Sequence, residues 1–356
     1  MSDWKELLLG QVINLKRGYD LPKRLREEGE VPIYSSSGIS GCNERAKVQP
    51  LGVVTGRYGT IGKIFLAKTP FWPLNTTLYV QDFKGNDPVF IYYFLKQVNW
   101  EQFNDKSAVP GINRNDVHQE IVKIPEREEQ EAIAAVLSSL DDKIDLLHRQ
   151  NKTLEAMAQT LFRHWFVDGA SAEWEEGTLG DVIYIYDKQR IPLSKMERNK
   201  MKDGDLYPYY GAASIMDYVN DYIFDGEYIL MGEDGTVKTD DGYPILQYAT
   251  EKFWINNHAH ILQAKKPYSN FLIWCYLKQK NINEIVTGAV QPKINQRNLK
   301  SLEFPIPPLE LVEEFITVTE PMFAKVKANN NQIRTLEKLR DTLLPKLMSG
   351  AVRVKF

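Results

Sequence analysis

The sequence lacks any long apolar run. None of its hydrophobic stretches approaches the length of about 18 residues that a membrane-spanning helix needs, and no basic-then-apolar leader follows Met1. Only two cysteines occur, Cys42 and Cys275, and they form no spaced pair. Reduced structural cysteines are typical of the cytoplasm. We therefore expect a cytoplasmic protein that makes no contact with a membrane.

Catalytic signatures are missing as well. The five histidines are scattered, and His258-x-His260 has no obvious third ligand, so a structural or surface role is favoured over a zinc site. No serine-hydrolase, zinc-protease, cysteine–histidine or amino-methyltransferase motif is found. We expect neither a metal site nor an active site in this chain.

One glycine-rich run superficially resembles a phosphate-binding loop. It extends from Gly56 to Lys63, but its glycine spacing is wrong and Ile64 stands where Ser or Thr would coordinate magnesium. A turn between strands explains the run better. Gly56 and Gly59, like Gly232 and Gly235 in a matching run, are then required by the backbone.

What the chain does contain is a long internal repeat. Trp4 and Gly10 recur as Trp174 and Gly180, and the offset then settles at 182 residues. At that offset the matching segments are Phe71-Trp72 with Phe253-Trp254, Asn75 with Asn257, and Thr153-Leu154-Glu155 with Thr335-Leu336-Glu337. Solenoid repeats have periods of up to about 50 residues. The repeat therefore predicts two copies of a whole module, with two similar binding surfaces.

Each copy has a globular part followed by a helical part. Residues 1–125 and 171–307 hold short β-branched or aromatic runs bounded by Gly, Asn or Pro, interrupted by helical stretches, which is typical of α+β domains. Residues 126–168 and 308–350 have helical periodicity. We expect an α+β fold of two globular domains joined by two long antiparallel heptad helices, with pseudo-two-fold symmetry.

The helical parts carry apolar residues at alternating steps of four and three, the pattern of a helix-pairing seam. The expected pairing residues are Ile144, Leu147, Asn151, Leu154 and Leu161 in the first copy, and Val326, Asn329, Ile333, Leu336 and Leu343 in the second. An antiparallel register that obeys the repeat places Asn151 opposite Asn329. Such a polar pair can fix the register of a seam.

Helix ends are also predicted from local signals. We expect a short helix first in each copy, after Pro125 and after Pro308. The longer helix then begins with Ser138-Ser139 as its cap in the first copy and with Pro321 in its first turn in the second. Pro345 is expected to end or kink the last helix.

The net charge of −3 hides uneven segments. Residues 1–125 carry 16 basic and 13 acidic side chains, whereas residues 164–307 carry 15 and 20. Basic residues gather at matching places in the two copies, namely Lys16, Arg17, Lys23, Arg24 and Arg26, and Lys188, Arg190, Lys195, Arg198, Lys200 and Lys202. One such run is usually a solvated loop, but two at equivalent positions favour contact with an anionic partner.

Several short sequence motifs resemble those of one known family. They are Lys123-Ile124-Pro125-x-x-Glu128-Glu129-Gln130-x-x-Ile133-Ala134-x-x-Leu137, Asp141-x-Lys143-Ile144, Leu161-Phe162-Arg163-x-Trp165-Phe166-Val167-Asp168, Gly288-Ala289-x-Gln291-x-x-Ile294, Ile306-Pro307-Pro308-Leu309-Glu310, and Leu343-Leu344-Pro345-Lys346-Leu347-Met348-Ser349-Gly350. With the repeat and the heptads, they make essentially the whole chain resemble the DNA-specificity subunit of type I restriction–modification systems. The first copy departs from the pattern at Val109-Pro110-Gly111-Ile112-Asn113, where the usual glutamine is absent.

The resemblance implies that each globular part is a target-recognition domain that reads one half of a bipartite double-stranded DNA target. The paired helices would set the unread gap and dock methyltransferase subunits, two of them. Those subunits would bind S-adenosylmethionine, and restriction or translocase subunits would join the assembly. This chain would then be a non-catalytic specificity subunit with no cofactor of its own.

Candidate DNA contacts are basic, amide, hydroxyl and aromatic side chains in the loops, since these groups bind phosphates or base edges. In the first copy they are Lys16, Arg17, Ser35, Ser36, Ser37, Arg57, Tyr58, Lys63, Asn75 and Thr76. In the second they are Lys188, Arg190, Tyr209, Tyr210, Asp234, Lys238, Asn257 and His258. The two copies differ most in these loops, so the two half-sites are expected to differ.

Two other functions fit the sequence less well. The chain could be a structural adaptor that bridges two partner subunits through its helices without reading DNA. It could also be a free-standing enzyme with an unfamiliar site. Binding to duplex DNA separates the first alternative from a recognition subunit, and a methyl-transfer assay on the isolated chain tests the second.

Overall fold

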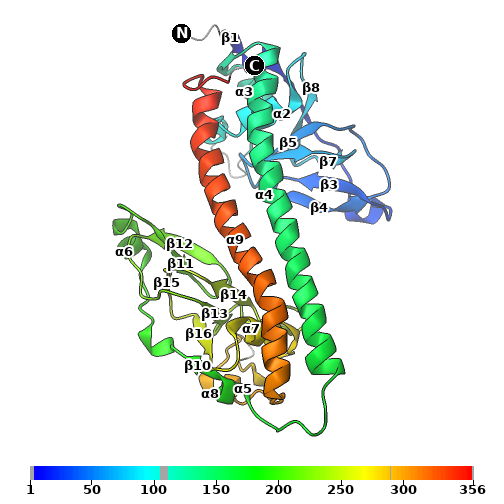
Figure 1. The fold of residues 1–356 in the computed structure, drawn as a ribbon. Coiled ribbons are helices and arrows are strands. Elements are labelled where there is room, and N and C mark those ends of the chain that lie inside the picture. The colour runs from blue at the N-terminus through cyan, green and yellow to red at the C-terminus, as the bar shows by residue number, and fades with distance from the viewer. Residues whose placement is uncertain (1–3, 105–110, 289, 355–356) are drawn as a thin grey trace. The chain divides into compact units, whose positions relative to one another are not determined.

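The computed structural model describes residues 4–104, 111–288 and 290–354. The chain forms two compact units, one of Met1–Leu146 with Gln332–Phe356 and the other of Leu147–Asn331. Two long helices, α4 (Arg127–Phe162) and α9 (Leu309–Met348), contribute a segment to each unit (Figure 1). Val109, Pro110 and Ala289, which belong to two of the motifs above, lie outside the described residues.

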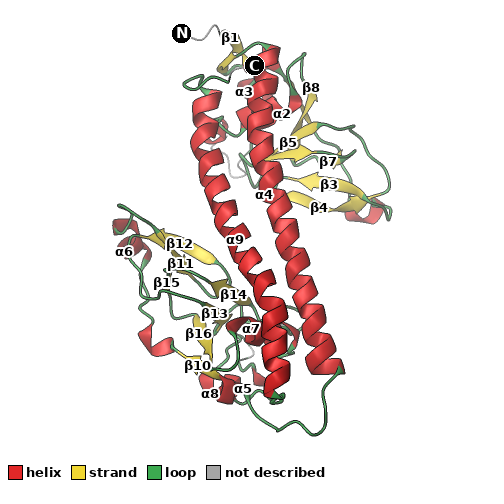
Figure 2. Cartoon of the chain, in the orientation of Figure 1, coloured by secondary structure: helices red, strands yellow, loops and turns green. Residues whose placement is uncertain are grey.

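The first unit holds two main sheets and a short strand pair (Figure 2). The four-stranded sheet has the order β2 (Asn14–Arg17), β8 (Thr77–Asp82), β5 (Gly52–Gly56), β6 (Ile64–Ala67). The three-stranded sheet has the order β4 (Gly38–Asn43), β3 (Val31–Ser35), β7 (Trp72–Pro73), and β1 (Lys5–Leu8) pairs with β9 (Ile121–Ile124). The helical segments are α1 (Leu9–Val12), η1 (Lys23–Leu25), α2 (Pro88–Leu95), η2 (Trp100–Phe103) and α3 (Arg114–Val117).

The second unit repeats this arrangement. Its four-stranded sheet has the order β10 (Ile183–Ile185), β16 (Ala259–Ala264), β13 (Tyr228–Gly232), β14 (Leu246–Ala249), and its three-stranded sheet the order β12 (Ile215–Val219), β11 (Tyr207–Tyr210), β15 (Trp254–Ile255). The helical segments are η3 (Arg163–Asp168), α5 (Leu179–Val182), η4 (Asp187–Gln189), α6 (Lys195–Lys200), α7 (Asn270–Gln279), η5 (Asn283–Ile285) and α8 (Gln296–Lys300). The strand orders match one for one, so the predicted duplication of a mixed module is confirmed at the level of topology.

An apolar helix fills the core of each module. The Asp87 carboxylate caps α2 by accepting the Phe90 N–H, and Pro88 fits the first turn. Ser269 caps α7 in the same way. Both helices are buried around most of their circumference and pack against strands of the four-stranded sheet of their own module. A helix that is apolar on all sides belongs in a protein interior.

In the first unit, α4 and α9 meet along an apolar seam. Ile133 and Leu137 of α4 share a buried cluster with Leu347 and Met348 of α9. Nearer the middle of both helices, an Arg340 nitrogen lies 2.8 Å from the Asp141 carboxylate. Earlier residues of α4 thus contact later residues of α9, so the two segments run antiparallel within this unit.

In the second unit, the seam contains the two asparagines. The Asn329 amide donates to Asn151 Oδ1 at 2.8 Å, and the Asn151 amide donates to Asn330 at 2.7 Å. Further along, the rings of Phe162 and Phe315 lie 6.0 Å apart. These segments also run antiparallel, and Asn151 faces Asn329 as the repeat predicts.

The predicted helix boundaries are wrong in three places. Ser138 and Ser139 lie inside α4, where their hydroxyls donate to carbonyls three residues earlier, and Pro321 lies inside α9. Helix α9 also passes Pro345 and ends at Met348. Proline removes one backbone hydrogen bond, but burial of Leu344 and Leu347 on either side holds the last turns in place. Among the residues described, no helix combines the length and apolar character required to cross a membrane.

An ion pair between half-exposed Arg353 and a buried carboxylate holds the C-terminal segment within the first unit. Two guanidinium nitrogens of Arg353 lie 2.6 and 2.7 Å from the Glu129 carboxylate, and the Trp4 indole N–H donates to the same carboxylate at 3.2 Å. Glu129 is almost fully buried. A buried carboxylate needs such partners because it has lost its water.

We predict that Arg353→Ala lowers the free energy of unfolding by about 2 kcal/mol, since it leaves a buried charge with one neutral donor. Urea denaturation followed by tryptophan fluorescence measures the loss. In the double variant Glu129→Gln with Arg353→Ala the charge is gone, so stability should partly recover. A double variant less stable than Arg353→Ala alone would contradict this explanation.

Candidate nucleic-acid interface

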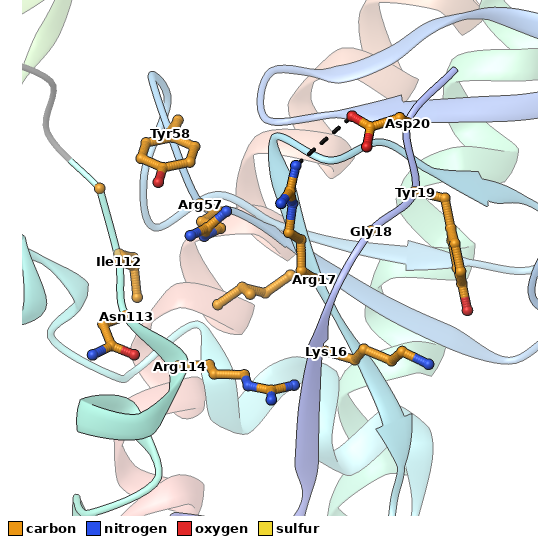
Figure 3. A pocket seen from close by; sticks show the side chains of 12 residues that line it. Lys16, Arg17, Gly18, Tyr19, Asp20, Arg57, Tyr58, Ile112, Asn113 and Arg114 are labelled. Atoms are coloured by element: carbon orange, nitrogen blue, oxygen red, sulfur yellow. Dashed lines mark ion pairs between the residues drawn. The ribbon is translucent and has the colours of Figure 1, made fainter.

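A basic hollow opens on the first module. It has a volume of about 670 Å³ and is lined by the end of β2, the turn after β5, and the start of α3 (Figure 3). The lining residues are Lys16, Arg17, Gly18, Tyr19, Asp20, Arg57, Tyr58, Leu78, Gly111, Ile112, Asn113 and Arg114. Segments far apart in the sequence thus place four cationic side chains around one space.

The turn that carries Arg57 requires its glycines. A Cβ on Gly56 would lie 1.8 Å from the Thr60 carbonyl oxygen, and Gly59 has a φ of +77°. Both constraints favour glycine. The Arg57 N–H donates to the Thr76 carbonyl at 2.8 Å, which anchors the turn to its neighbour. The predicted backbone role of these glycines is confirmed.

The hollow has an excess of positive charge. Arg17 lies 3.7 Å from the Asp20 carboxylate, as the dashed line in Figure 3 marks. Across the described parts of the chain, no carboxylate lies within ion-pair distance of Lys16, Arg57 or Arg114. Anions are therefore attracted to this place, and planar guanidinium groups suit phosphate oxygens in particular.

Aromatic rings accompany these cations. The Arg57 guanidinium lies 4.5 Å from the centre of the Tyr58 ring, a cation–π contact that leaves its N–H groups at the surface available. The Tyr19 hydroxyl lies 3.0 Å from that of Tyr79. This hydrogen bond, together with the charges of Lys16 and Lys47, holds the pKa of Tyr19 below its ordinary value.

The structure brings four of the ten predicted first-copy residues together. Lys16, Arg17, Arg57 and Tyr58 line the hollow. The other six do not line it. The Asn75 amide donates to Asp20, the Thr76 carbonyl accepts the Arg57 N–H, and Ser36 lies against the glycine turn. The Ser35 and Ser37 hydroxyls are 3.1 Å apart, and Lys63 is not among the lining residues.

Sequence reasoning missed three charged or aromatic members of the lining. Tyr19 and Asp20 directly follow the basic pair of β2, and Arg114 is the first residue of α3. Asn113 caps that helix through its side chain, which accepts the Asn115 N–H at 3.1 Å. A signal was available for Arg114, because it follows the loop that departs from the family pattern.

The second module carries a buried ion network. Asp187 and His260 are almost inaccessible, and their Oδ2 and Nδ1 atoms lie 2.6 Å apart. Arg190 pairs with Glu233 and also donates to the Ala259 carbonyl at 2.8 Å. The network therefore joins the end of β10, the end of β13 and the start of β16.

Both nitrogens of the His260 ring face acceptors. Besides Asp187 at Nδ1, the Ile294 carbonyl oxygen lies 2.9 Å from Nε2. Burial by itself raises the pKa of Asp187, but the hydrogen bond and charge of His260, the Ile261 N–H and Arg190 together hold that pKa below its ordinary value.

The ligand atoms of Asp187, Glu233 and His260 lie within 4.8 Å of one another, a spacing that would suit a metal ion. The two carboxylates also accept other hydrogen bonds: Asp187 accepts from Ile261 and from Gln296, and Glu233 accepts from Arg190. The arrangement acts as an internal ion network that braces three loops.

Several predicted second-copy contacts are placed elsewhere. Tyr209 and Tyr210 are core residues: Tyr209 packs with Val219 and Trp254, and Tyr210 belongs to a separate buried cluster. They are buried because each packs within an apolar cluster, so the prediction of surface contacts is wrong for these two.

The remaining second-copy candidates lie at or near the surface. Arg190 is engaged within the ion network, whereas Lys188 and Asn257 are exposed. Asp234 and His258 pair with each other at 2.5 Å, and Lys238 forms an isolated bridge with Pro244. The side chain of His258 is half exposed, whereas that of His260 is buried within the ion network.

The network predicts acid sensitivity of the second module. The pKa of Asp187 is lowered by folding, so its ionised form stabilises the fold above the unfolded value of about 3.9, and this contribution is lost as pH falls through the folded pKa. Asp187→Asn should lower the free energy of unfolding at neutral pH by about 1–3 kcal/mol and flatten its dependence on pH between roughly 5 and 3. Urea denaturation over this range measures both effects.

The exposed Asp205 of the same module supplies the control. Asp205→Asn should give a pH curve parallel to that of the unsubstituted protein. If Asp187→Asn also gives a parallel curve, Asp187 does not carry the predicted acid sensitivity.

Comparisons with known proteins agree with the repeat. The MjaIX specificity subunit of the type I restriction enzyme from Methanocaldococcus jannaschii is 25% identical over 374 residues, covering 91% of this chain and 84% of that protein. A putative type I specificity subunit from Haemophilus influenzae is 31% identical over 163 residues, which is 46% of this chain and 40% of that protein. The fold is shared with a crystal structure of the type I restriction–modification S subunit from M. genitalium, with a TM-score of 0.66, 20% identity, and coverage of 98% and 96% of the two chains. The family model described as "Type I restriction modification DNA specificity domain" matches residues 1–156 and 171–338, most of the chain, and the protein therefore belongs to that family.

Proposed function

We propose that this chain is the DNA-recognition subunit of a type I restriction–modification complex. Each globular module, 1–125 and 171–307, reads one half of a bipartite duplex target. The observation that carries the proposal is the duplication of one module with the same strand order in both sheets. Two similar modules with different loop chemistry suit a target made of two unlike half-sites.

The helical parts, 126–168 and 308–350, are proposed to set the unread gap and to dock two methyltransferase subunits. At 36 and 40 residues, α4 and α9 are long enough for such a spacer. Apolar side chains remain exposed on both helices: Leu146, Met157, Val318 and Leu339. Exposed apolar groups along a helix are suited to bind another protein.

The chemistry is proposed to reside in the partners. The methyltransferase subunits bind S-adenosylmethionine and transfer the methyl group, and restriction subunits complete the assembly. The chain itself determines which DNA sequence the complex binds. This division of labour fits the basic hollow, whose guanidinium groups can hold an anion.

The methylome of a host that expresses the chain with its methyltransferase subunits tests the proposal. We expect a bipartite methylated motif that disappears when the chain is omitted. Assembly of the complex with no preference for any duplex would instead favour an adaptor that only bridges its partners. Methyl transfer by the isolated chain would contradict a non-catalytic role.

The spacer makes a quantitative prediction. Inserting one heptad between Leu146 and Leu147 of α4, and another between Asn331 and Gln332 of α9, lengthens both helices at the boundary of the two units. Each helix grows by about 10 Å, which corresponds to about 3 base pairs of B-DNA. Methylome sequencing should show the same half-sites separated by a gap about 3 base pairs longer.

A seven-residue insertion in residues 169–172, which lie in the connection between η3 and the second module, is the control. It adds the same chain length without lengthening either helix, so the gap should not change. An unchanged gap after both helix insertions would refute the spacer role.

A further inference from the structure

The two modules share one backbone framework around the basic hollow. The Ile112 N–H donates to the Arg57 carbonyl at 3.0 Å, and in the second module the Ile294 N–H donates to the Glu233 carbonyl at 2.8 Å. A single β-bridge pairs Tyr58 with Gly111 in the first module, and an equivalent β-bridge pairs Asp234 with Lys293 in the second. Arg57 and Glu233 therefore occupy equivalent positions.

Two further equivalences follow from strand pairing and helix capping. Leu15 of β2 pairs with Val80 of β8, and Ile185 of β10 pairs with Leu262 of β16, so Leu15 and Ile185 are equivalent. Arg17 and Asp187, each two residues further along the chain, therefore correspond. Each of the helices α3 and α8 begins directly after a capping asparagine. Its first residue is Arg114 in the first module and Gln296 in the second.

The charges at these equivalent positions are reversed or removed. Arg17, Arg57 and Arg114 of the first module are replaced by Asp187, Glu233 and Gln296. Leu78, which also lines the first hollow, becomes His260, which pairs with Asp187. Asp20 becomes Arg190, which pairs with Glu233. One framework thus holds Arg57 and Arg114 without a carboxylate partner among the described residues in one module, and carboxylates paired with His260 and Arg190 in the other.

We propose that the hollow of the first module clamps a backbone phosphate of the DNA, and that the second module has no counterpart of this clamp. In the second module the carboxylate of Asp187 already pairs with His260, and that of Glu233 with Arg190 and Lys293, so these groups are not left for a phosphate. The inference rests on the proposed function. It adds that the salt-dependent part of the DNA affinity depends more on the first module than on the second.

The chemistry of the hollow favours a phosphate. Arg57 and Arg114 have no carboxylate partner among the residues that the structure describes, and Arg17 has only Asp20 at 3.7 Å. Arginine binds phosphate through paired N–H groups. Each phosphate contact also releases counterions, so the logarithm of the binding constant falls with the logarithm of salt concentration by about 0.9 per contact.

The test uses the full chain assembled with its methyltransferase subunits and two duplexes of equal length, one with the methylated target and one without. Fluorescence anisotropy gives the dissociation constants over a range of salt concentrations. Arg57→Gln and Arg114→Gln should each weaken binding to both duplexes by about five- to tenfold at 0.1 M salt and make the salt dependence shallower by about one. Arg57→Lys, which keeps the charge, should retain the slope of the unsubstituted complex.

Arg45→Gln is the matched control in the same module. Arg45 is exposed and already lies 3.5 and 3.8 Å from the carboxylates of Glu27 and Glu44, so its loss should leave the slope unchanged. In the second module, Arg190→Gln should lower the melting temperature without changing the slope, because Arg190 is engaged by Glu233.

Three outcomes overturn the clamp. In the first, Arg57→Gln and Arg114→Gln have the same DNA affinity and the same salt dependence as Arg45→Gln. They could weaken binding only to the target duplex, which would make them base-reading residues. Arg190→Gln could reduce the slope as much as Arg57→Gln, which would remove the asymmetry. If the unsubstituted complex shows no preference for the target duplex, the proposed function itself fails.

Discussion

Two buried amides determine how α4 meets α9 in the second unit. Asn151 and Asn329 are buried in a largely apolar seam, where the Asn329 amide donates to Asn151 and the Asn151 amide donates to Asn330. Shifting one helix by a turn would place an amide against leucine and leave its hydrogen bonds unmade, which is costly in a buried site. The register of the seam, and with it the placement of the module that packs on these segments, depends on this pair.

The two modules show how one framework can serve two electrostatic purposes. Backbone pairing around the hollow is the same in both, because it depends on strand register and on glycine-containing turns. Side chains at three of its positions have exchanged charge or lost it. Only backbone and core constrain the framework, so its surface charges can change without a change of fold.

Much of the framework could be predicted from the sequence because it depends on local periodicity and on the repeat. The asparagine pair and the glycine turn are of this kind. The helix boundaries were predicted less well: Ser138, Pro321 and Pro345 are unfavourable inside a helix only if no tertiary packing compensates. Burial of the neighbouring apolar residues supplies that compensation.

The binding surface was harder to predict. Tyr209 and Arg190 have side chains suited to DNA contact, but one is in the core and the other is bound to Glu233, and neither fact is visible without the three-dimensional contacts. The proximity of Arg114 to β2, where it donates to the Leu15 carbonyl at 3.4 Å, also depends on the three-dimensional contacts. Aligning the two copies position by position does reveal the exchange of Arg57 for Glu233, which composition alone conceals.

The division of the chain has a consequence for its biosynthesis. The first compact unit consists of Met1–Leu146 together with Gln332–Phe356, so its last part is translated only after the whole second unit. Until then, Ile133, Leu137 and the carboxylate of Glu129 lack their partners from α9 and from Arg353. The nascent first module therefore leaves the ribosome with an uncovered apolar stripe, and a premature stop codon near the 3′ end of the message would damage the unit that was made first.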